Sequence, residues 1–330
     1  METRLISRRA LKDAWEKDRD IDGLLRAVEG AFAAYDRGDV IFPEKSSQVF
    51  DEATQDRINC MPATVRPLGL SGVKWVSVFP DNPRKRGVPN VGGLMVLSEI
   101  ESGQPVCVMD AGYLTALRTA AVDALAARFL SVCGARTLAL IGTGEQARFH
   151  AELISLAVPS VEEVRVSGRT PEHVAGLAAV LREEGLQVVD MGSDMAGAVG
   201  GSDIVVTAIS GQDPVLKADW MFGPCLYCHV GGWEDEYEVP LKADKIVCDS
   251  WKDLKHRGSP TIARMFSEGL LADGDIHCDI ADILSGRKSG REGLEFVYFN
   301  AIGLGFVDVA VAAWLLGKVG ENVASFDFCS

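Results

Sequence analysis

The pattern of hydrophobic and polar positions divides the chain into a first part of short strands and a second part in which strands and helices alternate. Between residues 40 and 110, short runs rich in β-branched and aromatic residues are separated by Pro and Gly. Such runs are typical of a mostly antiparallel sheet, here with strands at residues 71–79, 91–97 and 105–110. From residue 137 onward, apolar runs alternate with helical segments, which predicts a parallel, doubly wound sheet with right-handed crossovers.

The alternating part can be divided into individual elements. Apolar runs of four to six residues predict strands at residues 137–141, 164–167, 204–207, 225–230 and 245–249, with a shorter one at 187–189. Apolar positions at helical spacing predict helices at residues 146–157, 171–182 and 195–200. Residues 261–290 are expected to be helical and polar, so the strand at 245–249 completes the predicted sheet.

Three more helices lie outside this alternation. Residues 20–38 have apolar positions at helical spacing, and residues 114–130 are rich in the strong helix formers Ala and Leu. Residues 306–316 form a final apolar helix, which we expect to pack against the first part of the chain. That packing would make the first part discontinuous in sequence.

These elements predict an α/β fold with two domains, which a length of 330 residues also suggests. One domain is a Rossmann doubly wound parallel sheet formed by residues 116–304. The other is a discontinuous α+β domain formed by residues 1–115 and 305–330.

Composition and charge exclude several classes of function. The net charge of −14 argues against nucleic-acid binding, and no run of about 20 apolar residues predicts a membrane helix. The charged start of the chain lacks the apolar core of a signal peptide. Eight scattered cysteines in a long chain favour reduced thiols, so we expect a cytoplasmic protein.

The motif Cys225-x-x-Cys228-His229 raises the question of a metal or redox site. It lies in a strand-like apolar run, where neighbouring side chains point to opposite faces, and no second pair of ligands follows it. We therefore interpret the two cysteines as buried structural residues and predict no metal.

A glycine pair follows the predicted strand at 137–141, where a helix should begin. Gly142-Thr143-Gly144 continues into Glu145 and Gln146, with Ala147 where a dinucleotide-binding turn has its third glycine or alanine. N–H groups at a helix start bind a pyrophosphate without any cationic side chain, provided that glycines let the backbone approach closely. We therefore predict that a dinucleotide binds at residues 142–146.

The second predicted strand ends in Ser167-Gly168-Arg169-Thr170. An NAD site usually has an acidic residue here for the ribose hydroxyls, whereas an Arg suits the 2′-phosphate of NADP. Arg169 and Thr170 are therefore predicted to contact the cofactor, and Arg169 favours NADP over NAD. The alternative is that Arg169 stacks on the adenine and does not discriminate between NADP and NAD.

Four segments, in the right order over nearly the whole chain, resemble the ornithine cyclodeaminase/mu-crystallin family. They are Gly72-Val73-Lys74-Trp75, Leu114-Thr115-Ala116-Leu117-Arg118-Thr119-Ala120-Ala121, Gly142-x-Gly144-x-Gln146-Ala147 and Gly286-Arg287-Lys288-x-Gly290-Arg291. The resemblance implies a homodimer in which the α+β domain binds substrate and forms the dimer contact. Residues 242–251 look most like the N-carboxyethyl-glutamate dehydrogenase branch rather than a true ornithine cyclodeaminase.

The resemblance also implies a substrate site. Lys74 and Arg118 match residues that bind the substrate carboxylate, and Lys45 takes the place of an upstream basic ligand. An unpaired ammonium is costly to bury, which favours a cleft-facing role for Lys74. Arg118 has a structural alternative, an ion pair at the domain junction. Asn90 stands where many relatives have a Thr near the substrate, with a plain turn residue after Pro89 as the alternative.

Further cofactor contacts are implied by the same resemblance. Residues 300–305, with Gly303 and Gly305, resemble the family segment beside the nicotinamide ring, and Thr119 belongs to the matching segment 114–121. Gly232, of the glycine pair Gly231-Gly232, is also predicted to contact the cofactor. Trp233 either walls the nicotinamide or substrate pocket or packs in the interior. Asp308 is interpreted as an acidic residue that favours the start of the last helix.

One loop departs from the family. Cyclodeaminases carry a Gly-x-Asp followed by Pro-Gly-Lys, and that Asp activates an amine or water. Residues 229–238 of this chain have neither feature. Glu234 or Asp235 is a candidate acid/base, because a carboxylate beside a closed cofactor site can have a raised pKa. The alternative is a solvated acidic loop.

The sequence therefore predicts an enzyme, an NAD(P)-dependent oxidoreductase that transfers hydride at the C–N bond of an α-amino or α-imino acid. Two alternatives remain. One is a cyclodeaminase that uses NAD without net turnover, against which the altered loop counts. The other is a ligand-binding or accessory protein, as mu-crystallin shows for this fold. The expected partners are a small amino or imino acid and a second copy of the chain, with no nucleic acid and no membrane.

Overall fold

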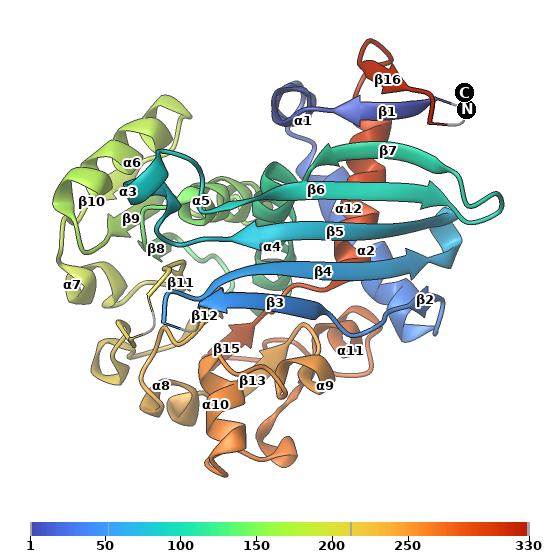
Figure 1. Ribbon diagram of the computed structural model, residues 1–330. Helices are drawn as coiled ribbons and strands as arrows, with labels where there is room; N and C mark the ends of the chain where they lie inside the picture. Colours follow the sequence, from blue (N-terminus) through green and yellow to red (C-terminus); the bar gives the residue numbers. More distant parts are fainter. Residues whose placement is uncertain (1, 52, 212, 329–330) are drawn as a thin grey trace. The chain divides into compact units, whose positions relative to one another are not determined.

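The computed structural model describes residues 2–51, 53–211 and 213–328. It contains two compact units, Met1–Arg118 with Leu304–Ser330, and Thr119–Gly303. These bounds differ from the predicted domains by three residues after position 115 and by one residue before position 305. Figure 1 shows the order of the elements along the chain.

The first unit is built on an eight-stranded sheet (Figure 1). The strand order is β16-β1-β7-β6-β5-β4-β2, and β3 also pairs with β4. Every pairing is antiparallel except β1 with β7, which confirms the predicted, mostly antiparallel sheet. The strands are β1 (Thr3–Ile6), β2 (Val40–Ile41), β3 (Ser46–Asp51), β4 (Asp56–Val65), β5 (Leu70–Val78), β6 (Val91–Glu99), β7 (Pro105–Asp110) and β16 (Ala324–Phe326).

Two helices from opposite ends of the chain cover one face of this sheet. Helix α12 (Gly305–Lys318) contacts α2 (Ile21–Asp36) and packs on β4, β5 and β6. Figure 1 shows both helices behind the sheet. Phe306 of α12 stacks on Tyr35 and meets Phe32 edge to face. The expectation that the last helix packs against the first part is therefore confirmed. The remaining helices of the unit are α1 (Arg8–Glu16) and α3 (Asn82–Arg86).

Helix α4 (Ala111–Leu130) follows β7 directly and leads to the second unit. It begins three residues earlier than predicted, because the Asp110 side chain accepts a hydrogen bond from the N–H of Tyr113 and so caps its first turn. Most of its length is buried. A helix so rich in Ala and Leu can be surrounded by protein on several sides.

The second unit is a parallel sheet of eight strands, in the order β10-β9-β8-β11-β12-β15-β13-β14. All of its pairings are parallel, which confirms the predicted doubly wound sheet. The strands are β8 (Thr137–Ile141), β9 (Glu163–Ser167), β10 (Val188–Asp190), β11 (Ile204–Thr207), β12 (Cys225–His229), β13 (Lys245–Cys248), β14 (Cys278–Asp279) and β15 (Phe296–Asn300). The helices are α5 (Glu145–Ala157), α6 (Pro171–Glu183), α7 (Met195–Val199), α8 (Glu238–Lys242), α9 (Trp251–Leu254), α10 (Thr261–Ser267) and α11 (Ile280–Leu284).

The prediction for the end of this sheet was wrong. Strand β15 was not expected, yet it lies between β12 and β13 and is buried along its whole length. Residues 261–290 are only partly helical, since β14 separates α10 from α11. The five residues of β15 are mostly aromatic and β-branched, which is a strand signal.

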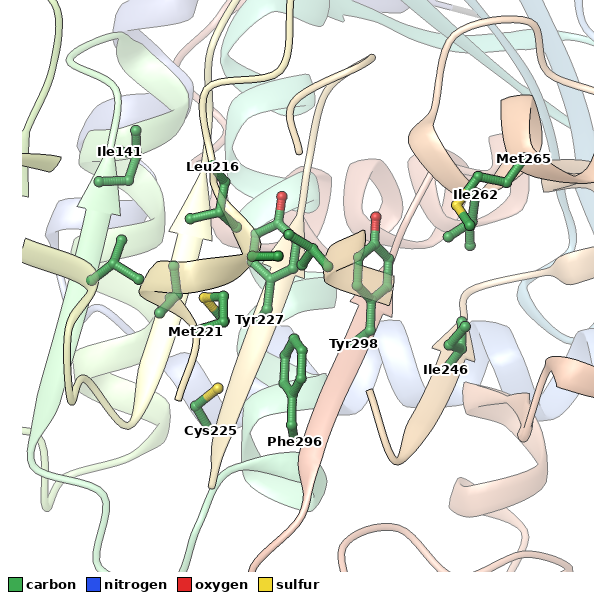
Figure 2. Close-up of a cluster of buried hydrophobic side chains, with 14 of the residues drawn as sticks. Ile141, Leu216, Met221, Cys225, Tyr227, Ile246, Ile262, Met265, Phe296 and Tyr298 are labelled. Carbon is green, nitrogen blue, oxygen red and sulfur yellow. The ribbon is translucent and has the colours of Figure 1, made fainter. Parts of the chain in front are cut away.

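Cys225 belongs to a hydrophobic cluster of the second unit, whereas Cys228 on the same strand does not. Figure 2 shows Cys225, Tyr227, Phe296 and Tyr298 on adjacent strands of this cluster. Cys228 is buried but does not belong to it, as expected if its side chain points to the other face. Burial raises the pKa of Cys225 to about 12 and that of Cys228 well above its usual range. Both thiols are protonated at neutral pH, in agreement with the structural interpretation.

Candidate active site

The glycine turn after β8 has the geometry of an anion cradle. The φ angle of Gly142 is 131°, and a Cβ there would overlap the carbonyl oxygen of Ala208 at the end of β11. Gly144 is the N-cap of α5, supplies no side-chain capping bond, and has open space where a Cβ would be. The first turn of α5 therefore presents its N–H groups without a capping side chain, as a bound pyrophosphate requires.

The neighbouring strand β9 ends beside this turn. A Cβ on Gly168 would lie 3.2 Å from the side chain of Thr143 and 3.4 Å from that of Val174, so the two turns are closely packed. The hydroxyl of Ser167 donates a hydrogen bond to the carbonyl of Gly192, so this side chain has a structural role. Arg169 is exposed, and Thr170 is the N-cap of α6 without a side-chain cap bond.

The acidic loop after β12 is buried, so its interpretation as a solvated loop was wrong. Glu234 is fully buried and accepts hydrogen bonds from the N–H groups of Ile209, Val230 and Gly231 at 2.9, 3.2 and 2.9 Å. Its carboxylate also accepts the hydroxyl of Thr207 at 2.8 Å. Burial raises the pKa of Glu234 to about 7, although these four donors favour the charged form.

This bonding pattern argues against Glu234 as the acid/base. Both of its oxygens hold the ends of β11 and β12 in place. A Cβ on Gly231 would lie 2.6 Å from Oε1 of Glu234, which explains the glycine at that position. Gly232, predicted to contact the cofactor, is half-buried in the same loop, and its nearest neighbour is Ser259.

Asp235 belongs to a different buried cluster. Its Oδ1 accepts the hydroxyl of Thr261 at 2.6 Å and lies 3.3 Å from the hydroxyl of Tyr298 and 3.4 Å from that of Tyr227. Figure 2 shows the two tyrosine hydroxyls pointing in the same direction. Within the described chain, the buried Oδ2 of Asp235 has no hydrogen-bond partner. Burial and the nearby Glu234 raise the pKa of Asp235 to about 8, so it holds a proton at neutral pH.

His229 completes this cluster, a role that the sequence did not reveal. Its Nδ1 is 3.0 Å from the side-chain amide nitrogen of Asn300, which can only donate, so Nε2 carries the hydrogen. That Nε2 faces Asp235 Oδ1 and the hydroxyl of Thr261, both at 3.3 Å. Burial lowers the pKa of His229 to about 4 and keeps the ring neutral.

Trp233 precedes these residues in the loop and is half-buried. The guanidinium of Arg264 lies 4.3 Å from its ring centroid, and the ring of Tyr237 is 6.0 Å away. These contacts favour packing over a role as a pocket wall. Its indole N–H is buried and has no hydrogen-bond partner in the described residues.

The segment after β15 is shaped by Asp249, a second residue that sequence reasoning missed. Oδ2 of Asp249 accepts hydrogen bonds from the N–H groups of Ile302 at 2.9 Å and Gly303 at 3.0 Å. Gly303 has a φ of 76°, a left-handed conformation that glycine adopts without strain. Burial raises the pKa of Asp249 to about 7. A carboxylate therefore fixes the turn that the family resemblance associates with the nicotinamide.

Gly305 has an explanation within the first unit. It begins α12, and a Cβ there would lie 3.2 Å from the carbonyl oxygen of Pro62 in β4. Close packing of a helix start against a strand is sufficient reason for this glycine. The role predicted for it at the cofactor remains a prediction.

The first unit brings Lys74 and Arg118 together around Asp308. Lys74 Nζ donates to Asp308 Oδ1 at 2.7 Å. Arg118 Nε lies 2.9 Å from the same oxygen, without the alignment of a hydrogen bond. Lys74 and Asp308 are fully buried, and the Arg118 side chain is 8% exposed. The structure thus shows an ion pair for Arg118 inside the first unit, and it corrects the interpretation of Asp308 as a simple helix-start residue. Lys74 is buried with a partner, whereas the argument for a cleft-facing role assumed an unpaired ammonium.

The other predicted site residues are less constrained. Lys45 is half-buried before β3, and Thr119 is a buried residue of α4. Asn90 is half-buried, and its carbonyl accepts the N–H of Phe79 at 2.7 Å, which continues the β5–β6 ladder beyond the pair of Val78 and Val91. Among the described residues, no group of three His, Cys, Asp or Glu side chains is arranged to hold a metal ion. No described helix is long and apolar enough to cross a membrane.

Comparisons with solved structures support the fold. A Δ1-pyrroline-2-carboxylate reductase from Thermococcus litoralis, in complex with NADH and L-proline, superposes with a TM-score of 0.90 at 26% identity. The match covers 98% of this chain and 100% of that one. An archaeal alanine dehydrogenase dimer with bound NAD superposes with a TM-score of 0.88 at 29% identity, over 99% of this chain and 100% of that one.

The sequence itself is similar to an alanine dehydrogenase from Archaeoglobus fulgidus, with 32% identity over 92% of this chain and 93% of the relative. For the branch suggested by residues 242–251, an N-((2S)-2-amino-2-carboxyethyl)-L-glutamate dehydrogenase from Staphylococcus aureus is 26% identical over 90% of both chains. The sequence model of one family matches residues 10–322. The chain therefore belongs to the ornithine cyclodeaminase/mu-crystallin family.

Proposed function

We propose that this protein is an NAD(P)-dependent oxidoreductase that transfers hydride at the C–N bond of an α-amino or α-imino acid. The observation that carries the proposal is the Gly142–Gly144 turn, where a Cβ at Gly142 would meet the carbonyl of Ala208 and the start of α5 lacks a side-chain cap. The relatives named for alanine and Δ1-pyrroline-2-carboxylate suggest the substrate class.

The substrate half of the proposal rests on Lys74 and Arg118. Two cations held within 3 Å of one carboxylate oxygen are an unusual arrangement for a buried position, where an unmatched charge is costly. Within the described residues, the other nitrogens of Arg118 form no hydrogen bond. Their N–H groups can therefore bind a substrate carboxylate as charge-assisted hydrogen bonds.

In this proposal the side chains of the protein orient the substrate, support the cofactor and move a proton. The nicotinamide, when bound, supplies or accepts the hydride. Lys74 and Arg118 orient the substrate by its carboxylate, and the turn at Ile302–Gly303, fixed by Asp249, supports the nicotinamide end of the cofactor site. We propose Asp235 rather than Glu234 as the acid/base, because Asp235 holds a proton at neutral pH and keeps one oxygen without a partner.

We propose NADP rather than NAD as the preferred cofactor. Arg169 is exposed directly after β9, and no acidic residue stands at positions 168–170. This arrangement suits a 2′-phosphate better than ribose hydroxyls. The two solved relatives bind NADH and NAD, so the preference has to be measured on this chain.

We also propose that the protein is a homodimer that uses the outer face of the first sheet. Trp75 of β5 and Leu94 of β6 are directly opposite each other and are 41% and 52% exposed. Contiguous exposed apolar patches mark interaction sites, and this cross-strand pair gives the outer face of the sheet an apolar centre. The archaeal alanine dehydrogenase relative is a dimer, and light scattering on this chain tests the same state here.

A substrate panel tests the proposed activity. The protein is incubated with NADPH or NADH and with 2-keto acids plus ammonia or amines, or with cyclic imines such as Δ1-pyrroline-2-carboxylate. We expect stoichiometric loss of the reduced nicotinamide absorbance. Ammonia release from ornithine at constant NADH would favour the cyclodeaminase, and tight binding without turnover would favour a binding or accessory protein.

A further inference from the structure

Asp308 connects three elements of the first unit. It lies in the first turn of α12, where a carboxylate favours the helix even when it is exposed to solvent. Here it is fully buried instead, and its Oδ1 is shared by Lys74 from β5 and Arg118 from α4. Burial of a carboxylate is costly and is offset only when the charge is paired. The position of Asp308 is therefore explained by its two cationic partners rather than by its helix.

The surroundings of Lys74 make its charge depend on Asp308. Its neighbours across the strands are Met61 of β4 and Met95 of β6, both buried and uncharged. In the described chain, the charged groups that act on it are Arg118 from α4, which repels it, and Asp308 from α12, which attracts it. Without Asp308, two cations would face each other in an apolar environment.

We infer that Asp308 is a positioning residue of the substrate site, which directs Lys74 and Arg118 to a common point and keeps Lys74 charged so that the pair can bind a carboxylate. The inference rests on the proposed function. Two positive charges and one negative charge leave one net positive charge, which matches a single substrate carboxylate.

The pH dependence of carboxylate binding follows from this arrangement. Burial and Arg118 lower the pKa of Lys74 to about 8, while Asp308 opposes both effects. Removal of the Asp308 charge lowers this pKa further. Lys74 then loses its proton at a lower pH, so the alkaline limb of carboxylate affinity moves toward neutral pH.

Asp308→Asn tests the inference with two ligands, in the presence of saturating NADP and, separately, of saturating NAD. L-Proline is measured as a substrate, and cyclopentanecarboxylate, which has the same ring without the nitrogen, as a competitive inhibitor. We expect the affinity for both to fall by a similar factor, roughly tenfold or more, with the alkaline limb shifted to lower pH. The affinity for NADH alone should not change.

Asp20→Asn is the matched control. Asp20 pairs with Lys318 at the other end of α12, at 2.9 Å, so this variant also removes an Asp–Lys pair from α12. Asn remains a good N-cap for α2. The control should leave both affinities and the pH profile of the wild-type protein unchanged.

Three results would overturn the inference. The first is wild-type affinity and pH profile in Asp308→Asn. The second is a loss of L-proline binding alone, which would make Asp308 a ligand for the substrate nitrogen. The third comes from Asp308→Glu, which keeps the charge but moves it by one methylene. It should weaken the binding of both ligands and leave the alkaline limb in place, and wild-type affinity would contradict positioning.

If the wild-type protein neither binds nor oxidises any amino acid, the proposed function itself fails. That failure is seen in the wild type, whereas failure of the inference is seen only in the variants, so the two are distinguishable.

Discussion

At the scale of single residues, burial changes what the acidic side chains do. The sequence left Glu234 and Asp235 between two interpretations, a candidate acid/base and a solvated acidic loop. In the structure, Glu234 and Asp235 are fully buried in different networks. Glu234 holds backbone N–H groups, whereas Asp235 meets hydroxyl groups and a neutral histidine. Neighbouring carboxyl groups thus have different predicted roles.

Glu234→Gln and Asp235→Asn separate these roles. Glu234→Gln replaces an accepting oxygen with an NH2 group and leaves backbone donors unsatisfied, which should lower the free energy of unfolding by about 2–3 kcal/mol. Asp235 is protonated at neutral pH, so Asp235→Asn should cost less than about 1 kcal/mol and yet lower kcat. Urea denaturation and steady-state kinetics measure both. Equal stability losses, or full kcat in Asp235→Asn, would contradict the assignment.

Arg169 determines cofactor choice if the proposal is right. Arg169→Ala should raise the KM for NADPH by roughly tenfold and leave the KM for NADH nearly unchanged, because only NADPH offers a phosphate to pair with. Arg182 lies near the C-terminal end of α6 and donates hydrogen bonds to the carbonyl of Val188 in β10. Arg182→Ala therefore serves as the control. An unchanged ratio of the two KM values in Arg169→Ala would leave adenine stacking as the explanation.

At the scale of elements, the glycines of the phosphate turn have different reasons to be there. Gly142 has no room for a side chain because the backbone carbonyl of Ala208 lies where its Cβ would be. Gly144, in contrast, has open space around it and an ordinary φ of −85°. We therefore propose that the open space at Gly144 holds the pyrophosphate of the cofactor. A methyl group there would approach the phosphates without straining the protein.

Gly144→Ala should fold like the wild-type protein and bind NADH and NADPH at least tenfold more weakly. Gly176→Ala is the matched control, because Gly176 lies inside α6 with open space around it. That control should bind as the wild type does and gain roughly 0.5–1 kcal/mol in stability. Fluorescence titration of the cofactor checks the prediction, and wild-type affinity in Gly144→Ala would remove the phosphate from this turn.

The family motif at residues 286–291 is explained by the end of α4. The Arg291 side chain donates to the carbonyls of Leu130 and Cys225 at 2.6 and 2.7 Å, and also to that of Glu295. A Cβ on Gly290 would lie 2.7 Å from the carbonyl of Phe129, so the loop approaches the helix end closely. The motif fastens the C-terminus of α4 to the starts of β12 and β15.

Arg291→Lys should therefore destabilise the protein by about 2 kcal/mol, because one ammonium cannot replace a guanidinium that bonds several carbonyls. Arg287→Lys is the comparison, since Arg287 is half-exposed and pairs with Asp282. Thermal unfolding of the two variants gives the difference. A similar Tm for both would show that the motif has another purpose.

At the scale of the whole molecule, the sequence predicted most of the architecture. The change from strand runs to strand–helix alternation identified both sheets, and the apolar last helix was correctly joined to the first part. What it missed depends on distant residues. Asp308 meets Lys74, which lies 234 positions away in sequence, and the place of β15 between β12 and β13 follows from its pairing with both strands.

The buried carboxyl groups also set the pH dependence of stability for the whole molecule. Burial raises the pKa of Glu234 and Asp249 to about 7 and that of Asp235 to about 8, above their values in an unfolded chain. Between the unfolded pKa values, of about 4, and these raised values, the folded state binds more protons than the unfolded state, so stability falls as pH rises across that window and levels off above about pH 8. Below about pH 6.5, His229, with its pKa lowered to about 4, acts in the opposite direction.

We therefore expect the free energy of unfolding to decrease between about pH 6.5 and pH 8, by up to about 1.4 kcal/mol per pH unit for each proton involved. Urea denaturation across this range measures the slope. Asp235→Asn should make the slope shallower, since it removes one of the titrating groups. A slope that is flat in the wild type, or unchanged in the variant, would contradict the raised pKa values of these buried carboxyl groups.

The proposed reaction passes hydride between a nicotinamide and the Cα of an amino or imino acid. NADH or NADPH carrying deuterium at the transferable C4 position of the nicotinamide tests it directly, with Δ1-pyrroline-2-carboxylate, or pyruvate plus ammonia, as the acceptor. Mass spectrometry of the amino-acid product should find one deuterium at Cα for each reduced cofactor consumed. Product formed without deuterium, or ammonia released while the cofactor stays reduced, would contradict the account.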